Sequence, residues 1–317
     1  MDETLTADTV RSWGRRYSNW GRWGPDDQRG TLNFITPDRV LAACALPRRG
    51  LVISCALPFD RNGPQPAGGP RHNPIHLMLA DGGDALAGAQ DFPGGFQYAD
   101  DAVYMPLQCG TQWDALAHVF YDGKMYNDRD VGLVTSQGAR ANSIDQIADG
   151  VVARGVLLDL PRGLGKPWLE DGTRIRPQDL DTCAERQGVT VEAGDVMLVR
   201  TGMMRRCLEA GSWEGYCGGP APGLSLHCAA WLYEREVAAV ATDTWGVEVI
   251  PNETVDCFQP LHMICLRNTG LLLGEIFQLD TLAEACAEDG RYAFLFTAPP
   301  LPISGAVGSP INPLAIK

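Results

Sequence analysis

The feature that most constrains the fold is a regular alternation of apolar runs and amphipathic segments in the second half of the chain. Short apolar runs at residues 151–160, 195–202, 237–244, 269–277 and 292–301 are bounded by polar or glycine-containing turns, as buried strands are. Helical patterns lie between several of these runs, at 176–188, 225–236 and 279–290. Strands that alternate with helices predict an α/β layer fold with a partly parallel sheet.

The first hundred residues are less regular. Residues 1–35 hold three tryptophans among many turn residues, which indicates an ordered aromatic arm rather than a disordered tail. Thr36 and Pro37 are suited to cap and begin a helix through about Leu46. Residues 61–100, rich in glycine and proline, are predicted to form a long loop. We see no internal repeat and no linker, so a single domain over 1–317 is predicted.

The stretch LQCGTQWDALAH, residues 107–118, concentrates polar chemistry. Asp114 and His118 are four residues apart beside a Gly-Thr turn, so an acid and an imidazole can form an acid/base or ligand pair. Gln108 and Gln112 stand where a metal site would need imidazoles. Three interpretations follow: a metal centre, a centre that has lost its metal, or an ordinary loop in which His118 is a core residue.

Acidic residues within apolar runs mark further candidates in the second half. Glu275 lies inside GLLLGEIFQL, where a carboxylate is costly to bury unless it is protonated, paired or bound to a cation. The simpler alternative is a buried salt bridge, for example to Arg267. His262 lies just ahead of that strand, and Asp243 ends the run VAAVATDT, where α/β folds place site residues.

The composition excludes several classes of partner. With 26 Lys+Arg against 39 Asp+Glu, the formal net charge is −13, which repels nucleic-acid phosphates and anionic lipid. No run of 18 apolar residues and no signal-peptide order occurs, so no membrane partner and a cytoplasmic location are expected. The sequence has no GxGxxG motif between a strand and a helix, so no nucleotide cofactor is expected. The ten cysteines form no CxxC pair, and Cys109 is the candidate if one of them is a nucleophile.

The stretch at 107–118 resembles HxGTHxDxPxH, the signature of the cyclase family, which includes bacterial kynurenine formamidase and isatin hydrolase. The segments RWGPDDQRGTLNFITPDRVLAA, VEAGDVMLVRTG and LHMICLRNTGLLLGEIFQLDTLA also resemble blocks of that family, in family order. The resemblance therefore covers nearly the whole chain. It implies a swivelling β/β/α-type fold, with a mixed sheet and flanking helices, assembled as a homo-oligomer (a dimer or tetramer).

The resemblance also implies a set of site residues. In metal-dependent members, the two motif histidines and the aspartate bind zinc or manganese, and a later histidine and glutamate complete the site. The last motif histidine acts in catalysis. Four matching positions are retained here, and they are Asp114, His118, His262 and Glu275.

Three positions depart from the family signature. Gln108 and Gln112 replace its two ligand histidines, and Leu116 replaces its proline. An amide oxygen is a weaker and harder ligand than an imidazole, more suited to calcium or magnesium than to zinc. A divalent metal (manganese or zinc) and a metal-free pocket in which the glutamines bind substrate therefore stay open as near-equal alternatives. The ligands of a metal would come from Asp114, His262, Glu275, Gln108 and Gln112.

These implications predict a hydrolase that acts on a C–N bond of a formamide, lactam or other cyclic amide in a small aromatic or cyclic substrate. His118 would be the general acid/base, assisted by Asp114 and Gln112. The alternatives are a metal-independent cyclase, dehydratase or lactone-opening enzyme on a natural-product-like substrate, and a non-catalytic small-molecule binder. The substrate pocket is predicted to include Trp23, His76, Phe96, Trp113 and Asp243.

Overall fold

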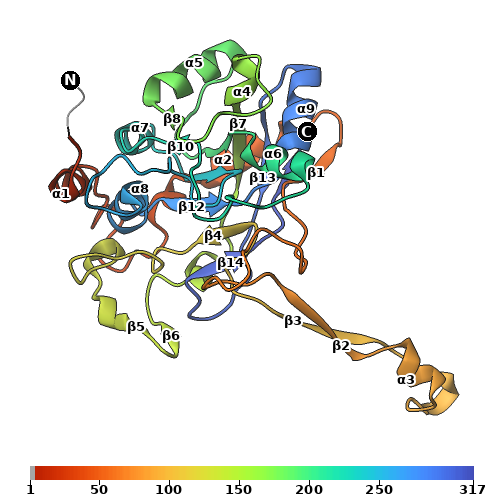
Figure 1. Cartoon of the computed structure of the whole chain (residues 1–317). Helices are drawn as coiled ribbons and strands as arrows, with labels where there is room; N and C mark the ends of the chain where they lie inside the picture. The colour runs from red at the N-terminus through yellow and green to blue at the C-terminus, as the bar shows by residue number, and fades with distance from the viewer. Residues whose placement is uncertain (1–3) are drawn as a thin grey trace.

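The computed structural model describes residues 4–317, so the first three residues of the predicted N-terminal arm lie outside the described residues. A curled nine-stranded sheet forms its centre, in the order β1-β15-β13-β7-β9-β11-β12-β4-β14 (Figure 1). The four central strands β7, β9, β11 and β12 are parallel, and every other pairing in this sheet is antiparallel. Helices flank the sheet, which confirms the predicted mixed α/β architecture.

The strands of the main sheet are β1 (Val52–Ser54), β4 (Gln112–Asp114), β7 (Val152–Asp159), β9 (Val196–Arg200), β11 (Ala239–Thr242), β12 (Leu272–Glu275), β13 (Ala293–Thr297), β14 (Gly308–Pro310) and β15 (Leu314–Ile316). Three two-stranded sheets pair β2 (Ile75–Ala80) with β3 (Asp100–Tyr104), β5 (Val134–Thr135) with β6 (Gly138–Ala139), and β8 (Arg174–Ile175) with β10 (Gly223–Leu224).

The helices are α1 (Ala7–Arg16), α2 (Pro37–Cys44), α3 (Gly82–Leu86), α4 (Leu160–Gly163), α5 (Pro177–Gln187), α6 (Met203–Ala210), α7 (Cys228–Glu234), α8 (Pro260–His262) and α9 (Asp280–Asp289). A π-helical segment, η6 (Met263–Thr269), continues α8 directly. Among residues 4–317, no helix has the length and apolar character needed to cross a bilayer.

The predicted strands and helices of the second half are all present, although most are shorter than their sequence patterns. The strand β9 is buried along its whole length because helices cover both faces of the parallel sheet. The helix α5 ends where Gly188 adopts a left-handed conformation with φ of 63°, as the closing glycine predicts. Elements of this kind were predictable because apolar periodicity and helix-end signals agreed.

The predicted loop at 61–100 is wrong in its second part. Residues 75–104 form a β-hairpin that projects far from the body, with Ile75 paired to Tyr104 at its base and α3 near its tip (Figure 1). The short apolar run IHLMLA forms β2, and the glycines and prolines flank the hairpin or form its distal turn. The glycines and prolines do lie in turns, but these turns bound the two strands of the hairpin.

The aromatic segment at the N-terminus is ordered in its described part, as predicted. Thr6 caps α1 through a reciprocal capping box with Thr9. Trp13 and Trp20 pack against the main core, and the Trp20 indole Nε1 donates to the backbone oxygen of Arg267 at 2.7 Å. This segment therefore supports η6, the segment that follows His262.

Candidate active site

The strand β4 places the two polar side chains of the QWD sequence. It lies between β12 and β14, and Gln112 pairs with Glu275 across the antiparallel ladder. Because side chains alternate along a strand, Gln112 and Asp114 share one face and Trp113 takes the other. Trp113 is fully buried against Phe277, so it does not share the face of Gln112 and Asp114, and its predicted pocket role stays untested.

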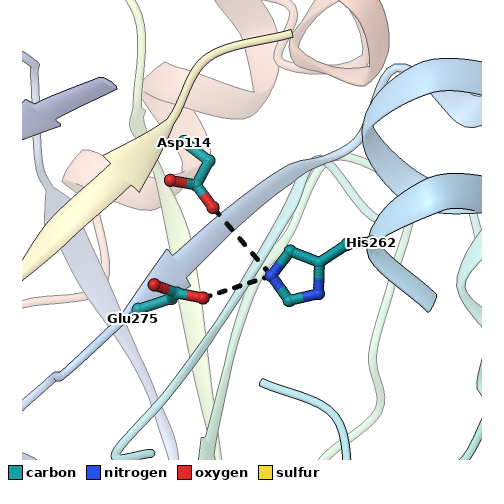
Figure 2. Close-up of side chains that lie close together, drawn as sticks. All are labelled: Asp114, His262 and Glu275. Atoms are coloured by element: carbon teal, nitrogen blue, oxygen red, sulfur yellow. Dashed lines mark hydrogen bonds and ion pairs between the residues drawn. The ribbon is translucent and has the colours of Figure 1, made fainter. Parts of the chain in front are cut away.

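Glu248 and Glu275 hold His262 from opposite sides of its ring. His262 Nδ1 lies 2.6 Å from Glu248 Oε1, and Nε2 lies 3.1 Å from Glu275 Oε1. Asp114 Oδ2 lies 4.0 Å from the same Nε2, and Figure 2 shows the carboxylates of Asp114 and Glu275 directed at that nitrogen. Glu248 also accepts the backbone N–H groups of Leu261 and His262 at 3.0 Å, which fixes the first turn of α8.

A positive charge is required between His262 and the acids. If Nδ1 donates to Glu248, the Nε2 of a neutral ring would present a lone pair to Glu275 at 3.1 Å. Two facing acceptors repel, so either a second proton or a cation must lie there. Burial alone would lower the pKa of His262, but its hydrogen bonds to Glu248 and Glu275 and their charges raise it to about 10. Burial and the charge of Asp114 raise the pKa of Glu275.

Gln112 links the two acids that face His262. Its amide Nε2 donates to Glu275 Oε2 at 2.7 Å and to Asp114 Oδ1 at 3.3 Å. Three buried polar atoms of this motif have no hydrogen-bond partner within residues 4–317: Gln112 Oε1, Asp114 Oδ2 and Gln108 Nε2. Buried polar groups are normally satisfied, so unpaired oxygens beside a ring nitrogen indicate a space for a ligand.

The residues present fit a hard divalent cation. Asp114, His262 and Glu275 each offer one ligand atom, and these atoms all lie within 4.8 Å of one another. A carboxylate that accepts from the second ring nitrogen, as Glu248 does, is the usual support of a histidine that binds a metal. Carboxylate and amide oxygens with one imidazole suit manganese or magnesium better than zinc.

His118 lies at the edge of the cluster. Its Nε2 is 3.8 Å from Asp114 Oδ1, and 23% of its side chain is exposed, whereas Asp114 is buried. The imidazole is therefore the group in this cluster that can exchange protons with an incoming molecule and with water. Asp114, His118, His262 and Glu275 do converge on one place, as the resemblance implied.

Three more of the predicted pocket residues, Trp23, His76 and Phe96, do not belong to this cluster. The Trp23 ring packs on Phe34 and lies under the Arg22 guanidinium, and it is not one of the residues found in contact with the cluster. His76 pairs with Asp101 on the projecting hairpin, and Phe96 stacks on Tyr98 near its tip. Both residues belong to the hairpin that projects from the body, so neither joins this cluster within the chain, and their pocket role stays a prediction.

Asp243 has a structural role that the sequence did not reveal. Its carboxylate accepts hydrogen bonds from Thr201 N, Thr201 Oγ1 and Gly202 N, each at 2.7 Å. Both oxygens thus accept hydrogen bonds from the turn after β9, so Asp243 is held outside the cluster around His262, and its pocket role stays a prediction. Cys109 is fully buried, and burial raises its pKa to about 11, which disfavours the thiolate a nucleophile needs.

Sequence reasoning missed three residues near the site. Glu248 lies in the alternating run WGVEVI, and a buried acid there carries the same signal that identified Glu275. The Arg71 guanidinium lies over the Trp245 ring and donates to the backbone oxygen of Gln108 at 3.1 Å. The buried indole nitrogen of Trp245 has no partner within residues 4–317. No local pattern identifies Arg71 or Trp245.

Comparisons with known proteins show the family of this chain. Residues 34–249 match the family described as "Putative cyclase". A crystal structure of a novel cyclase is 37% identical, with 96% of this chain and 99% of that chain covered and a TM-score of 0.87. The chain belongs to the cyclase family.

More distant structures share the fold. Isatin hydrolase A from Ralstonia solanacearum is 21% identical, with 88% of this chain and 97% of that chain covered and a TM-score of 0.61. Isatin hydrolase A from Labrenzia aggregata is 20% identical, with 87% and 95% covered and a TM-score of 0.60. No curated protein gives a significant match. This cyclase-family chain therefore has the isatin hydrolase fold, with its own polar cluster in the central sheet.

Proposed function

We propose that this cyclase-family protein is a hydrolase that opens a C–N bond of a formamide, lactam or other cyclic amide in a small aromatic or cyclic substrate. The observation that carries the proposal is the buried cluster around His262, in which Asp114 Oδ2 and Gln112 Oε1 lack partners. The partly exposed His118 borders this cluster. A buried ligand space beside an accessible imidazole is what water-dependent opening of an amide requires.

Asp114, His262 and Glu275 would hold the divalent cation. Gln112 would be a further oxygen ligand if its amide group rotates so that the oxygen and nitrogen exchange places. When bound, the cation would polarise the substrate carbonyl and lower the pKa of a water molecule. Gln112 in its present orientation donates to both acids and keeps their oxygens directed into the ligand space. Glu248 keeps the His262 ring in place and a proton on Nδ1.

His118 moves the proton of the reaction. Its Nε2 lies 3.8 Å from Asp114 Oδ1, and this carboxylate is placed to orient the ring. The imidazole accepts a proton from the attacking water and transfers it to the leaving nitrogen. The leaving group then departs as a neutral amine. Without an acid it would have to depart as an amide anion, which is the unfavourable step of amide cleavage.

One observation favours the metal-independent alternative. Gln112 Nε2 already satisfies one oxygen of Asp114 and one of Glu275, and a proton on His262 Nε2 satisfies another. A proton on His262 would then take the place of the cation, and His118 with Asp114 would serve ring closure, dehydration or lactone opening.

A substrate panel with metal control tests the proposal. Purified protein, prepared without chelator, is assayed on an aryl formamide, a lactam such as isatin and an aryl lactone, before and after EDTA treatment. We expect the formamide or the lactam to be opened, with activity lost in EDTA and restored by manganese. Turnover of the lactone alone, insensitive to EDTA, would replace the proposal by the alternative.

The His118→Ala variant tests the acid/base assignment separately. We expect kcat to fall by about 10²–10⁴-fold while the metal content of the protein is unchanged, since His118 transfers protons and is not among the cation ligands. His118→Gln, which preserves size and polarity, should be equally inactive. Turnover at the normal rate in both variants would show that another group moves the proton.

A further inference from the structure

The segment that precedes the projecting hairpin is held against the motif of the candidate site. Gln65 Nε2 donates to the backbone oxygen of Cys109 at 2.9 Å, and Arg71 Nη1 donates to the backbone oxygen of Gln108 at 3.1 Å. The segment itself forms neither helix nor strand at these positions. Its hydrogen bonds to the motif therefore decide where the Arg71 side chain lies.

Arg71 has no acidic partner in the described part of the chain. Its guanidinium is partly buried and makes one hydrogen bond, to the Gln108 backbone oxygen, although it carries five N–H donors. By contrast, Arg200 at the end of β9 is paired with Asp159 and Asp280, each at 2.8 Å. Arg71 thus keeps an uncompensated charge and most of its donors for another molecule.

Trp245 lies beside this guanidinium. The Arg71 Cζ is 5.7 Å from the centroid of the Trp245 ring. Ile276 N donates to Thr244 O at 2.9 Å, so the residue that follows Thr244 lies next to the end of the strand that carries Glu275. The Trp245 indole Nε1 is buried and has no partner among the described residues. A buried indole N–H normally has an acceptor, so an acceptor is expected at this point.

The charge of Arg71 reaches the acids of the cluster without pairing with them. Burial and the charge of Asp114 raise the pKa of Glu275, and Arg71 is among the charges that act in the opposite direction. Burial also raises the pKa of Cys217 to about 12, and the charges of both Arg71 and Glu275 act on that thiol. Arg71 and Glu275 therefore lie within electrostatic range of each other and of the same side chain.

The unpaired atoms around the cluster are of two chemical kinds. Asp114 Oδ2 and Gln112 Oε1 are acceptors without a donor, as a cation or a donor group would require. The Trp245 indole N–H and most N–H groups of Arg71 are donors without an acceptor, and Gln108 adds another at Nε2. A carboxylate suits these donors, because it accepts two parallel N–H groups from a guanidinium and keeps lone pairs for an indole.

The acids fix the direction in which such a ligand can lie. Asp114, Glu275 and Glu248 would repel a carboxylate, so an anionic ligand must place that group at Arg71 and a neutral amide at the cluster. The Trp245 ring beside Arg71 offers a flat apolar face to an aromatic ring. Together these residues favour a ligand with a carboxylate at one end and an aromatic ring next to it.

We propose that Arg71 and the Trp245 indole N–H bind a carboxylate of the substrate, so that the C–N bond opened at the cluster belongs to an anionic aromatic amide. This inference rests on the proposed hydrolysis and names its class of substrate. Arg71 is a specificity residue, since it binds the substrate and moves no proton. Its contact is the same before and during the reaction, so its loss should raise KM much more than it lowers kcat.

The test compares charged and neutral forms of the same substrate. The substrates are the ortho, meta and para isomers of formamidobenzoate, which place the carboxylate at three distances from the formamide. Their methyl esters keep the shape and remove the charge. Full-length protein is assayed with manganese. The ratio of kcat/KM for each acid to kcat/KM for its ester measures carboxylate recognition, and any general loss of activity cancels in it.

Three variants change the proposed carboxylate site in different ways. Arg71→Met keeps the length of the side chain without its charge, Arg71→Lys keeps the charge without the planar fork, and Trp245→Phe keeps the ring without the N–H. Arg61→Met, at an exposed arginine of the same segment, is the matched control.

We expect the wild type to prefer at least one acid to its ester by at least about tenfold, as a hydrogen-bonded charge pair provides. The acid-to-ester ratio should fall by about 10–100-fold in Arg71→Met, through KM, and by about tenfold in Trp245→Phe. Arg71→Lys should fall between Arg71→Met and the wild type, because a lysine retains the charge alone. Arg61→Met should match the wild type.

Calorimetric titration with the three aminobenzoates and with aniline measures recognition without turnover. The wild type should bind one aminobenzoate at least about tenfold more tightly than aniline, and Arg71→Met should lose this difference. Thermal unfolding verifies that each variant is folded. If Arg71→Met does not fold, Arg71→Lys and Trp245→Phe should still show the loss, at smaller size.

The outcomes separate this inference from the proposed hydrolysis. Formamide hydrolysis with the same acid-to-ester ratio in the wild type and Arg71→Met would overturn the carboxylate site and leave the hydrolase proposal standing. Aminobenzoate binding that depends on Arg71, without hydrolysis of any formamide, would support the site and refute the reaction. An equal loss on acids and esters would reduce Arg71 to a structural support of its segment. Neither binding nor turnover of any isomer would overturn both.

Discussion

Replacing Glu248 should both destabilise the fold and weaken metal binding, because one carboxylate serves three donors. Its Oε2 accepts from Leu261 N, and its Oε1 accepts from His262 N and His262 Nδ1. In Glu248→Gln, one of these oxygens becomes an NH₂ group, so at least one buried N–H faces another donor. An unsatisfied buried donor costs about 1–3 kcal/mol, so we expect a loss of about 2 kcal/mol in the free energy of unfolding.

Glu248→Ala should cost more, about 3–5 kcal/mol, because it leaves all three donors unpaired in a buried site. In either variant the His262 ring loses the group that orients it, which should weaken manganese binding by about 10–100-fold. Urea unfolding in EDTA gives the stability change, and electron paramagnetic resonance of free manganese gives the affinity. Both readouts are independent of any substrate.

Glu234→Gln is the matched control, since Glu234 is an exposed acid at the end of α7. It should change neither quantity. If Glu248→Gln stayed within about 0.5 kcal/mol of the wild type and bound manganese equally well, the role assigned to Glu248 would be wrong. A stability loss with unchanged affinity would limit its role to the first turn of α8.

Three further predictions concern the same region. Gln112→His restores the imidazole of the family signature and should raise zinc affinity by at least about tenfold in a competition titration with a chromophoric chelator; unchanged affinity would place Gln112 outside the ligand sphere. Asp243→Asn should lower the free energy of unfolding by about 2 kcal/mol in urea, because one oxygen that accepts from the turn after β9 is replaced by a donor; wild-type stability would refute that role. Because the pKa of folded His262 is raised to about 10, its proton stabilises the metal-free protein fully below about pH 6.5, and this stability is lost as the pH rises towards 10. Unfolding in EDTA across that range should show the loss in the wild type and a flatter profile in His262→Gln, and equal profiles would contradict it.

Much of the site could be predicted because its chemistry lies in one short motif and in acids placed within apolar runs. Asp114 and His118 came from the motif, and Glu275 from the cost of burying a carboxylate. The same cost applies to Glu248, which was not among the predicted site residues. Strand alternation, applied to QWD, directs the Trp113 side chain away from Gln112 and Asp114, and the structure buries it in the core.

Other features could not be derived from local sequence. Asp243 ends a strand where sites often lie, but its carboxylate closes the turn after β9, a contact set by the neighbouring strand rather than by its own segment. Arg71 reaches the site from a glycine- and proline-rich region with no regular pattern. The hairpin at 75–104 was hidden because its turn residues dominated the composition of the stretch. Long-range pairing decided each of these cases.

The short strand β4, held by antiparallel neighbours on both sides, limits how this protein can change during evolution. Inserting or deleting one residue within it would turn an indole towards the ligand space and drive two polar side chains into the core. Length changes should therefore be confined to the surrounding loops, while this strand varies by substitution alone. Replacement of histidine by glutamine at position 112 is the kind of change that such a strand permits.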